Sequence, residues 1–292
     1  MDTSIVQDRF SKPAQLVGTA RFAKMTQTVR SHWPEYLAEA SELCLFMVSA
    51  CAFSVLLEHP ASPIQQAISS EFLRRAIAGI AMGLTAFALV HSPMGRRSGA
   101  HMNPSVTLMF LRLRKIAPWD AGFYMMSQFM GGFLGVVVAW WVFGNQLSDG
   151  KVNFAVTRPG PAGVSLAFVA ELLISFVLAF TVLLVSNHRQ LSRLTPYFSA
   201  SLVATFITLE APFSGMSMNP ARTLASAILP HAFHALWIYF VAPPIGMLLA
   251  SELYLCLRSA EKVYCAKFHH HNSARCIFRC RFSELLHSQE TN

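Results

Sequence analysis

Two short segments of this 292-residue chain combine residue types that can cap a helix and donate hydrogen bonds. The first reads Ser-Gly-Ala-His-Met-Asn-Pro-Ser-Val-Thr-Leu from Ser98 to Leu108. The second reads Ser-Gly-Met-Ser-Met-Asn-Pro-Ala-Arg-Thr-Leu from Ser214 to Leu224. They begin 116 residues apart (214 − 98) and are identical at seven of eleven positions. This agreement indicates an internal repeat.

Each copy of the repeat has the pattern of a helix start. Asparagine is a good N-cap residue, because its side-chain oxygen accepts from free backbone N–H groups, and proline suits the first helical position. These residues are Asn103-Pro104-Ser105 in the first copy and Asn219-Pro220-Ala221 in the second. The mostly apolar continuations, 104–112 and 220–229, would be about 13–14 Å long, or half of a membrane core of about 30 Å. We expect two half-helices that reach the middle of a membrane without crossing it.

The composition favours a membrane over water as the surroundings of these half-helices. The chain is 53% hydrophobic and 13% charged, whereas a soluble domain carries about 25% charged residues. The same composition excludes a disordered chain, a disulfide scaffold and a long coiled coil. The net charge of +8 would suggest nucleic acid as the partner of a soluble protein. In so apolar a chain it indicates Lys and Arg collected on one side of a bilayer, so we expect no nucleic-acid partner.

Six stretches are apolar enough to cross a bilayer, which takes about 20 residues. The fifth is the weakest, because Pro196 and several serines and threonines dilute it. The stretches are Tyr36–Leu57, Phe72–His91, Trp119–Phe143, Leu166–Ser186, Tyr197–Leu209 with a few residues upstream, and His234–Leu257. The predicted fold class is therefore an all-α membrane protein with six transmembrane helices and two re-entrant half-helices.

The two half-helices are expected to form an inverted repeat. One copy of the motif follows the second span and the other follows the fifth, so each belongs to a half with three spans. Three is odd, so the second half enters the membrane from the opposite side, an arrangement known from transport proteins. The expected organisation is a leader (1–33), a channel domain (34–258) with halves at about 34–143 and 160–258, and a basic tail (259–292).

The basic residues predict the orientation of the spans. If the N-terminus lies inside, the inner segments hold 18 of the 23 Lys and Arg residues, and Arg74 and Arg75 are exceptions on the other side. This bias predicts a multi-pass protein of the plasma or inner membrane with both termini in the cytoplasm. The leader lacks the features of a signal peptide, so we expect the first span to stay as an anchor.

The motifs resemble those of the aquaporin, or major intrinsic protein, family. The resemblance covers about Tyr36–Leu257, and the chain looks like a bacterial-like member with long N- and C-terminal extensions. The first copy departs from the family pattern, since Ser105 stands where the family usually has Ala; Ser is nearly as small, so we expect little change. Further positions that resemble the family are Glu39, Tyr124, Gln128, Glu171 and Pro243.

The resemblance implies a passive channel. The amides of Asn103 and Asn219 would donate to the passing molecule, and the positive ends of both half-helices would oppose cations. Neutral molecules should pass, while protons and ions are excluded. Glu39 and Glu171 would support the backbone of the re-entrant loops, with His101 as a further loop support. A proton relay through the two carboxylates is the alternative.

Arg222 corresponds to the arginine of the family's outer constriction. It stands three residues after Asn219, inside a half-helix, where an unpaired charge is costly. Its donors would orient the permeant and repel cations. The alternative is a structural ion pair with a loop carboxylate such as Glu210.

Gapless counting from the two asparagines assigns the rest of this constriction. It gives Ile207, Met216 and Gly83, and a one-residue shift would put Met82 in place of Gly83. With Gly83, we expect a wider and more apolar constriction than in a strict water channel.

Other positions favour water as the permeant. Thr223, Ala227 and the pair Tyr239-Phe240 resemble water channels more than glycerol channels. The two signals conflict, so we predict water as the main permeant, with small neutral solutes also passing. The alternatives are a glycerol and small-solute facilitator with little water selectivity and, less favoured, an alternating-access transporter. No enzymatic site and no cofactor are expected, and the resemblance implies a homotetramer in the lipid bilayer.

The tail holds cysteines and histidines at intervals that could bind Zn²⁺. The candidate ligands are Cys265, His269, Cys276 and Cys280. A reducing cytoplasm argues against disulfides among the cysteines. The spacing lacks the usual opening pair of zinc sites, so no metal is predicted, and a solvated basic tail is preferred. A lipid-surface contact or a palmitoylation site is a further alternative.

Overall fold

The computed structural model describes the backbone of residues 4–287 and the side chains of residues 22–287. The two ends of the predicted leader and tail, 1–3 and 288–292, lie outside the described residues. In the described range the chain forms only helices, as the predicted fold class requires. They are α1 (Ser4–Glu58), α2 (Pro63–Ala67), α3 (Glu71–His91), α4 (Pro93–Ser98), α5 (Pro104–Arg112), α6 (Pro118–Phe143), α7 (Asn145–Ser148), η1 (Asn153–Ala155), α8 (Val164–Ser186), η2 (Ser192–Leu194), α9 (Thr195–Leu209), α10 (Ala211–Ser214), α11 (Pro220–Ile228), α12 (Trp237–Leu257), η3 (Ala260–Lys262) and α13 (Phe282–His287).

Among the described residues, five helices are long and apolar enough to cross a membrane: α1 in its part Phe22–Glu58, and α3, α6, α8 and α12. The fifth predicted span is the helix α9, whose 15 residues make it shorter than the others. The sixth span begins at Trp237 and not at His234. The reason is local, because Ala235 has a left-handed backbone with φ of 56°, which an α-helix cannot contain.

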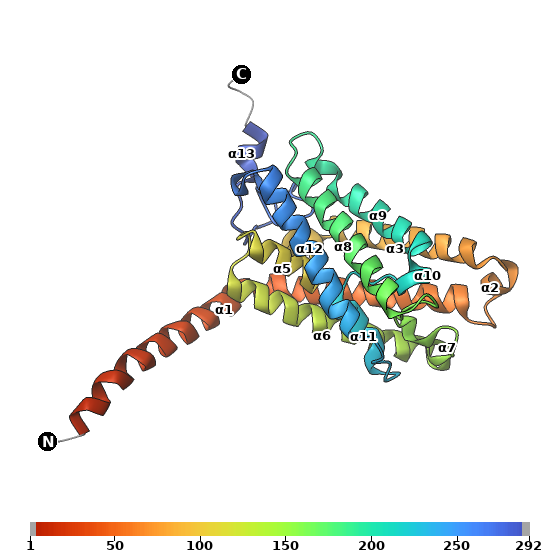
Figure 1. Ribbon diagram of the computed structural model, residues 1–292, viewed down its shortest axis with the longest axis horizontal. Helices are drawn as coiled ribbons and strands as arrows, with labels where there is room; N and C mark the ends of the chain where they lie inside the picture. Colours follow the sequence, from red (N-terminus) through yellow and green to blue (C-terminus); the bar gives the residue numbers. More distant parts are fainter. Residues whose placement is uncertain (1–3, 288–292) are drawn as a thin grey trace.

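The first span is the end of a much longer helix. The helix α1 has 55 residues and begins in the predicted leader, without a break at the expected boundary near residue 34. Figure 1 shows its N-terminal part projecting away from the bundle as a single rod. The polar composition of the leader did not predict this helix.

The helices pack in pairs that interlock the two halves of the chain. The helix α1 lies against α6, and α8 lies against α12 (Figure 1). The helices α3 and α9, which come from different halves, pack on each other. Each half-helix also contacts a span of the other half, α5 with α12 and α11 with α6. Neither half could therefore bury its apolar faces alone.

The two half-helices begin where the repeat predicts. The helix α5 has the expected bounds, and α11 ends at Ile228, one residue earlier than expected. The side-chain oxygen of Asn103 accepts from the backbone N–H of Ser105 at 2.8 Å. The side-chain oxygen of Asn219 accepts from the N–H groups of Ala221 and Arg222 at 3.1 and 3.2 Å. Both asparagines therefore cap their helices.

One arginine that departs from the charge bias has a partner. Arg74 is buried, and its guanidinium lies 3.2 Å from the carboxylate of Glu58. It also donates to the carbonyls of Ile68 and Ser69. A buried charge needs partners of this kind, so Arg74 closes the connection between α1 and α3.

Candidate functional site

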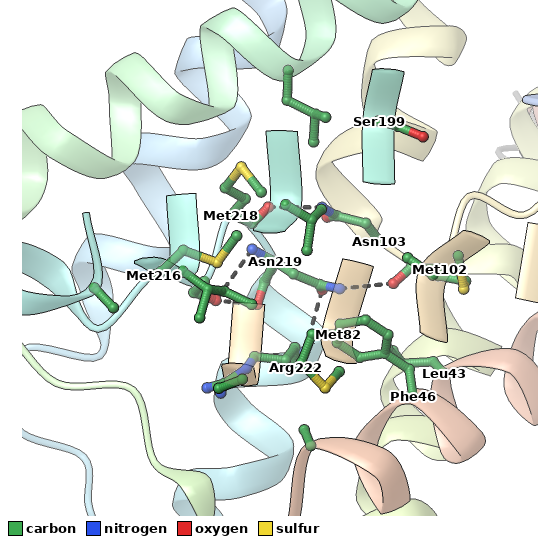
Figure 2. A pocket seen from close by; sticks show the side chains of 18 of the residues that line it. Leu43, Phe46, Met82, Met102, Asn103, Ser199, Met216, Met218, Asn219 and Arg222 are labelled. Carbon is green, nitrogen blue, oxygen red and sulfur yellow. Dashed lines mark hydrogen bonds between the residues drawn. The ribbon is translucent and has the colours of Figure 1, made fainter. Parts of the chain in front are cut away.

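A long cavity lies between the two copies of the repeat. Its volume is about 240 Å³, and Figure 2 shows the side chains that line its central part. Arg75 and Val90, both on α3, line it, and 15 residues of helix separate them by about 22 Å. At one end, the distal mouth, the lining residues are Leu57, Glu58 and Arg75. At the other, the tail-side mouth, they are Val90, Ser199 and Phe268.

The two loops before the half-helices have the same unusual backbone. Ala100 and Met102 have φ of 58° and 49° in the first loop, and Met216 and Met218 have φ of 49° and 55° in the second. Such left-handed residues are uncommon outside glycine and cost free energy unless their surroundings fix them. The same conformation in both copies means that the repeat extends from sequence to backbone geometry.

The two asparagine amides meet in the middle of the cavity. The Nδ2 group of Asn103 donates to the carbonyl of Met218 at 2.7 Å, and that of Asn219 donates to the carbonyl of Met102 at 2.7 Å (Figure 2). Both asparagines line the cavity. Each NH₂ group has two hydrogens, so one remains for a molecule in the cavity.

Two fully buried carboxylates hold the loops in place. Glu39 accepts from the backbone N–H groups of His101 and Met102 at 2.8 and 2.7 Å. Glu171 accepts from those of Ser217 and Met218 at 2.6 and 2.7 Å. Neither carboxylate lines the cavity, which disfavours the proton-relay alternative.

Two serines and two tyrosines complete this support. The hydroxyls of Tyr124 and Tyr239 donate to the carbonyls of Ser98 and Ser214, at 2.8 and 2.5 Å. The hydroxyl of Ser98 donates to Glu42 at 2.8 Å, and that of Ser214 donates to Glu171 at 2.8 Å. The sequence motif did not assign these serine roles or Glu42. The sequence feature that could have indicated the serine roles is that both copies of the repeat begin with a serine.

His101 connects the first loop to the tail. Its Nδ1 atom lies 3.1 Å from the hydroxyl of Thr107, and its Nε2 atom lies 2.9 Å from the carbonyl of Ala266. Its ring stacks on Phe278, with centroids 5.3 Å apart. The predicted loop support therefore also contacts a segment far away in the sequence.

Three of the predicted constriction residues, Ile207, Met216 and Arg222, line the cavity. Gly83 does not, and the alternative Met82 does. A Cβ atom on Gly83 would lie 2.7 Å from the carbonyl oxygen of Ala200 on α9. The expectation of a wide constriction at Gly83 is therefore wrong, because this glycine faces α9 and allows close helix packing. At this level of α3, the side chain that lines the cavity is Met82.

Arg222 has no ion pair with Glu210. Its Nη1 atom contacts the hydroxyl of Thr157, and both carboxylate oxygens of Glu210 lack a hydrogen-bond partner. The structural alternative for this arginine is therefore wrong. Thr157 was missed, because it lies in the irregular connection between η1 and α8, where no pattern relates it to the repeat.

The tail brings one group of potential metal ligands together. Cys265, His270, Cys276 and Cys280 offer ligand atoms that all lie within 4.8 Å of one another. The ligand set predicted from the sequence included His269 in place of His270, and this assignment is wrong. The ring of His269 lies instead beside that of His91, with centroids 4.7 Å apart. Three consecutive histidines, 269–271, left the choice open in the sequence.

The central part of the cavity thus offers the charged donor Arg222, the two amide donors and a mostly apolar wall, while Glu58 and Arg75 line the distal mouth. The N-terminal ends of α5 and α11 meet there, each equivalent to about +0.5 charge. Small neutral molecules that accept hydrogen bonds fit this environment, whereas a cation meets positive potential.

The chain is similar to known proteins over most of its length. A family model described as major intrinsic protein matches residues 25–254. Aquaporin NIP1-2 of Arabidopsis thaliana is 32% identical over 187 residues, which cover 63% of this chain and 63% of that protein. Aquaporin NIP2-3 of Zea mays is 35% identical over 190 residues, covering 64% and 60%. The chain thus spans less than two thirds of the length of these curated relatives.

A solved structure has the same fold. The X-ray structure of the aquaglyceroporin from Plasmodium falciparum superposes with a TM-score of 0.64 at 20% sequence identity. The match covers 76% of this chain and 95% of that one. At this identity the likeness establishes the architecture alone.

Proposed function

The chain belongs to the major intrinsic protein family of membrane channels, and on this premise we propose that it is a passive channel for water that also passes small neutral solutes. It is a multi-pass membrane protein and not an enzyme. The observation that carries the proposal is the long cavity in which Asn103 and Asn219 meet.

The exclusion of protons follows from the donors at this meeting point. A water molecule whose oxygen accepts from both amides turns its own hydrogens outward, toward its two neighbours in the file. It cannot then accept from a neighbour, so the chain of hydrogen bonds that a proton would follow is interrupted. The positive ends of α5 and α11 oppose cations at the same place.

The constriction beside Arg222 favours small neutral solutes in addition to water. Met82, Ile207 and Met216 are apolar, and Arg222 supplies the hydrogen-bond donors. An apolar wall opposite a donor suits molecules with a hydrocarbon side and a polar side. This observation supports the second candidate, a glycerol and small-solute facilitator with little water selectivity.

The roles of the residues form part of the proposal. The midpoint of the pore consists of Asn103, Pro104, Ser105, Asn219, Pro220 and Ala221. The constriction consists of Met82, Ile207, Met216 and Arg222, and the loop supports are Glu39, Glu171 and His101. We place this channel, residues 34–258, in the plasma or inner membrane, with both termini cytoplasmic and four copies in a homotetramer.

The test is permeability in proteoliposomes, measured by stopped-flow light scattering with water and with glycerol. Because Phe268 stands in the tail-side mouth, the Phe268→Ala variant is measured beside the full chain. Arg222→Ala should raise glycerol permeability and admit cations, and Ile207→His should lower the ratio of glycerol to water. A proton current that accompanies water flux contradicts the proposal, as does a saturable flux that depends on an ion gradient.

A further inference from the structure

The tail keeps a fixed course without regular structure. The 19 residues from Val263 to Arg281 (281 − 263 + 1), all within the described range, contain neither helix nor strand. Even so, Val263, Ala266 and Phe278 are buried. Irregular segments of this length are uncommon in compact domains, and small units without a large core usually need a cross-link.

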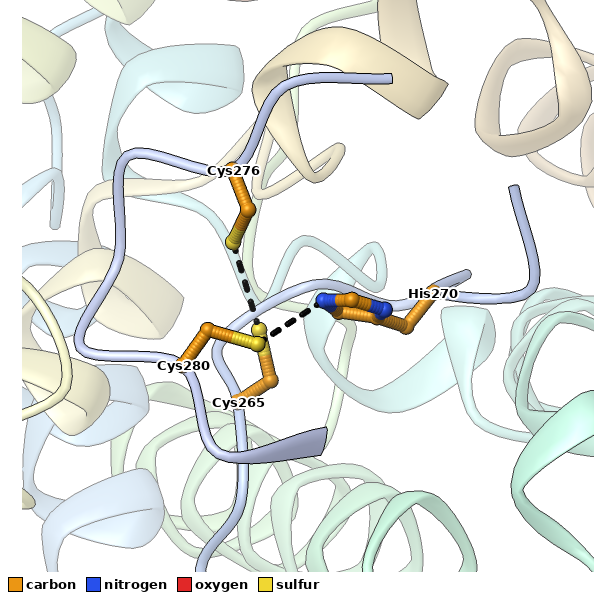
Figure 3. A group of neighbouring side chains, drawn as sticks. All are labelled: Cys265, His270, Cys276 and Cys280. Atoms are coloured by element: carbon orange, nitrogen blue, oxygen red, sulfur yellow. Dashed lines mark hydrogen bonds between the residues drawn. The ribbon is translucent and has the colours of Figure 1, made fainter. Parts of the chain in front are cut away.

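Four side chains of this segment point toward one centre (Figure 3). The Sγ atoms of Cys265 and Cys276 are 3.6 Å apart. The Sγ atom of Cys280 is 2.9 Å from the Nε2 atom of His270. In a tetrahedral zinc site with Zn–S bonds of about 2.3 Å, neighbouring sulfurs would be about 3.8 Å apart. The cluster therefore needs only small adjustments to enclose an ion.

We propose that Cys265, His270, Cys276 and Cys280 form a structural Zn²⁺ site that fixes the tail across the tail-side mouth of the channel. Three sulfurs and one imidazole in a tetrahedron are a known ligand set for structural zinc. Soft thiolate ligands also disfavour Mg²⁺ and Ca²⁺, which prefer oxygen. The closing pair Cys276 and Cys280, with three residues between them, has a spacing that zinc sites use.

The surroundings of the cluster suit a zinc thiolate centre. The backbone N–H of Phe282 donates to the Sγ atom of Cys280 at 3.4 Å. The ring of Phe282 stacks on His270, with centroids 4.3 Å apart. Such outer contacts orient ligands and raise metal affinity. Three thiolates around Zn²⁺ would leave one net negative charge. The Nζ group of Lys267 donates to the carbonyl of Arg275 at 2.7 Å, which places a cation beside Cys276.

The residues between the first two ligands in the sequence, Cys265 and His270, contact the channel. Between Cys265 and His270, the carbonyl of Ala266 accepts from His101, and the Nζ group of Lys267 donates to the carbonyl of Arg96 at 2.6 Å. The N–H of Phe268 donates to the carbonyl of Gly99 at 3.1 Å, and its side chain lines the cavity. A bound ion would hold this short segment at both of its ends, Cys265 and His270. It would therefore fix Phe268 in the tail-side mouth.

The consequence for permeation rests on the proposed function. With zinc bound, Phe268 stays in the tail-side mouth and permeability is low. Without zinc, the irregular tail loses its cross-link, Phe268 leaves the mouth and permeability rises. The metal site would thus regulate the channel, while metal binding itself can be tested without any transport assay.

Metal binding is tested on the purified full chain in a reducing buffer. Elemental analysis should find one zinc per chain, and Co²⁺ in its place should give the absorption of a tetrahedral cobalt thiolate. Outer contacts alone change metal affinity by about 10–100-fold, so His270→Ala and Cys276→Ser should each weaken zinc binding by at least about 100-fold. The matched controls His269→Ala and Cys256→Ser should bind as the parent does. Equal loss in His269→Ala and His270→Ala would overturn the assigned site, as would a disulfide between Cys265 and Cys276 under reducing conditions.

Because a cysteine variant could misfold, the unmodified chain supplies a second measurement. Arg275 and Arg279 are exposed, but they stand in a backbone of fixed course. A chelator should free this backbone and speed tryptic cleavage after both arginines, and added zinc should slow the cleavage again. Unchanged cleavage overturns the inference.

Permeability separates this inference from the proposed function. Zinc removal should raise water permeability several-fold in the parent chain, and Phe268→Ala should be permeable with zinc bound. If both conduct but zinc has no effect on the parent, regulation by the metal is wrong and the channel function stands. If neither conducts water or glycerol with or without zinc, the proposed function itself is wrong, while the binding data still decide the metal site.

Discussion

At the scale of single residues, the loops beside the cavity depend on two carboxylates. Glu39 and Glu171 each receive two backbone N–H groups from a loop whose left-handed residues cannot pair within a helix. A carboxylate has enough acceptor sites for several donors at once. The hydrogen bonds offset the cost of burying the charge, and the charge in turn fixes a backbone that would otherwise be strained.

Replacement of Glu171 by Gln should therefore be destabilising, although the two side chains have the same shape. The amide puts an NH₂ group where an acceptor is needed, so one backbone N–H loses its partner at a cost of about 1–3 kcal/mol. We expect a lower midpoint of thermal unfolding in detergent and a lower water permeability.

The matched control for this substitution is Glu252→Gln. Glu252 pairs with Arg112 at 2.7 Å, and both side chains are 47% exposed. Surface pairs contribute about 0–1 kcal/mol, so this variant should unfold as the parent does. Equal midpoints for Glu171→Gln and Glu252→Gln would show that the loop does not depend on the buried carboxylate.

The residues of the site could be predicted from the sequence in two cases: where they recur in both copies of the repeat, and where a charged residue stands in an apolar span, which is energetically costly. The asparagines stand at equal places in two copies, and Glu39 and Glu171 are charges inside apolar spans. Thr157 and His270 had no such signal, because their places depend on the course of irregular segments. For such segments, a sequence pattern names residue types but not the atoms that meet.

At the scale of elements, the helix α3 lines the cavity with one face and packs against α9 with another. Met82 lines the cavity, whereas Gly83 lies against the backbone of α9. Adjacent residues on a helix point about 100° apart, since there are 3.6 residues per turn. A shift of one position in the sequence count therefore exchanges a cavity-lining residue for a packing residue.

This arrangement predicts a change of selectivity for one of two neighbouring substitutions and a loss of stability for the other. Met82→Ala should widen the constriction and raise the ratio of glycerol to water permeability. Gly83→Val should leave that ratio unchanged and lower stability by about 1–3 kcal/mol, because added atoms would overlap the backbone of α9. Stopped-flow permeability and thermal unfolding of both variants check the assignment. A larger change of the ratio in Gly83→Val would reverse it.

The bounds of the elements were predictable where composition changes sharply. The half-helices and four of the spans begin and end within about two residues of the expected positions. The continuous helix α1 was not predictable, because hydropathy reports the part of a helix that can lie in lipid and not where the helix begins. Domain boundaries drawn from hydropathy alone have the same weakness.

At the scale of the whole molecule, the two halves contribute equivalent contacts to one site. Tyr124 holds the carbonyl of Ser98 in the first loop, and Tyr239 holds that of Ser214 in the second. Each loop then places its asparagine against a carbonyl of the other half. The hydrogen bonds between the loops couple the halves, while each tyrosine has a partner of its own.

The inverted repeat therefore predicts a symmetric response to two distant substitutions. Tyr124→Phe and Tyr239→Phe each remove one buried hydrogen bond, so each should cost about 1–2 kcal/mol. Because the tyrosines share no partner in these bonds, the double variant should show the sum within about 0.5 kcal/mol. Unfolding of all three variants under one set of conditions measures this. A double variant much less stable than the sum would mean that the loops support each other through Asn103 and Asn219, and that the site folds as one cooperative unit.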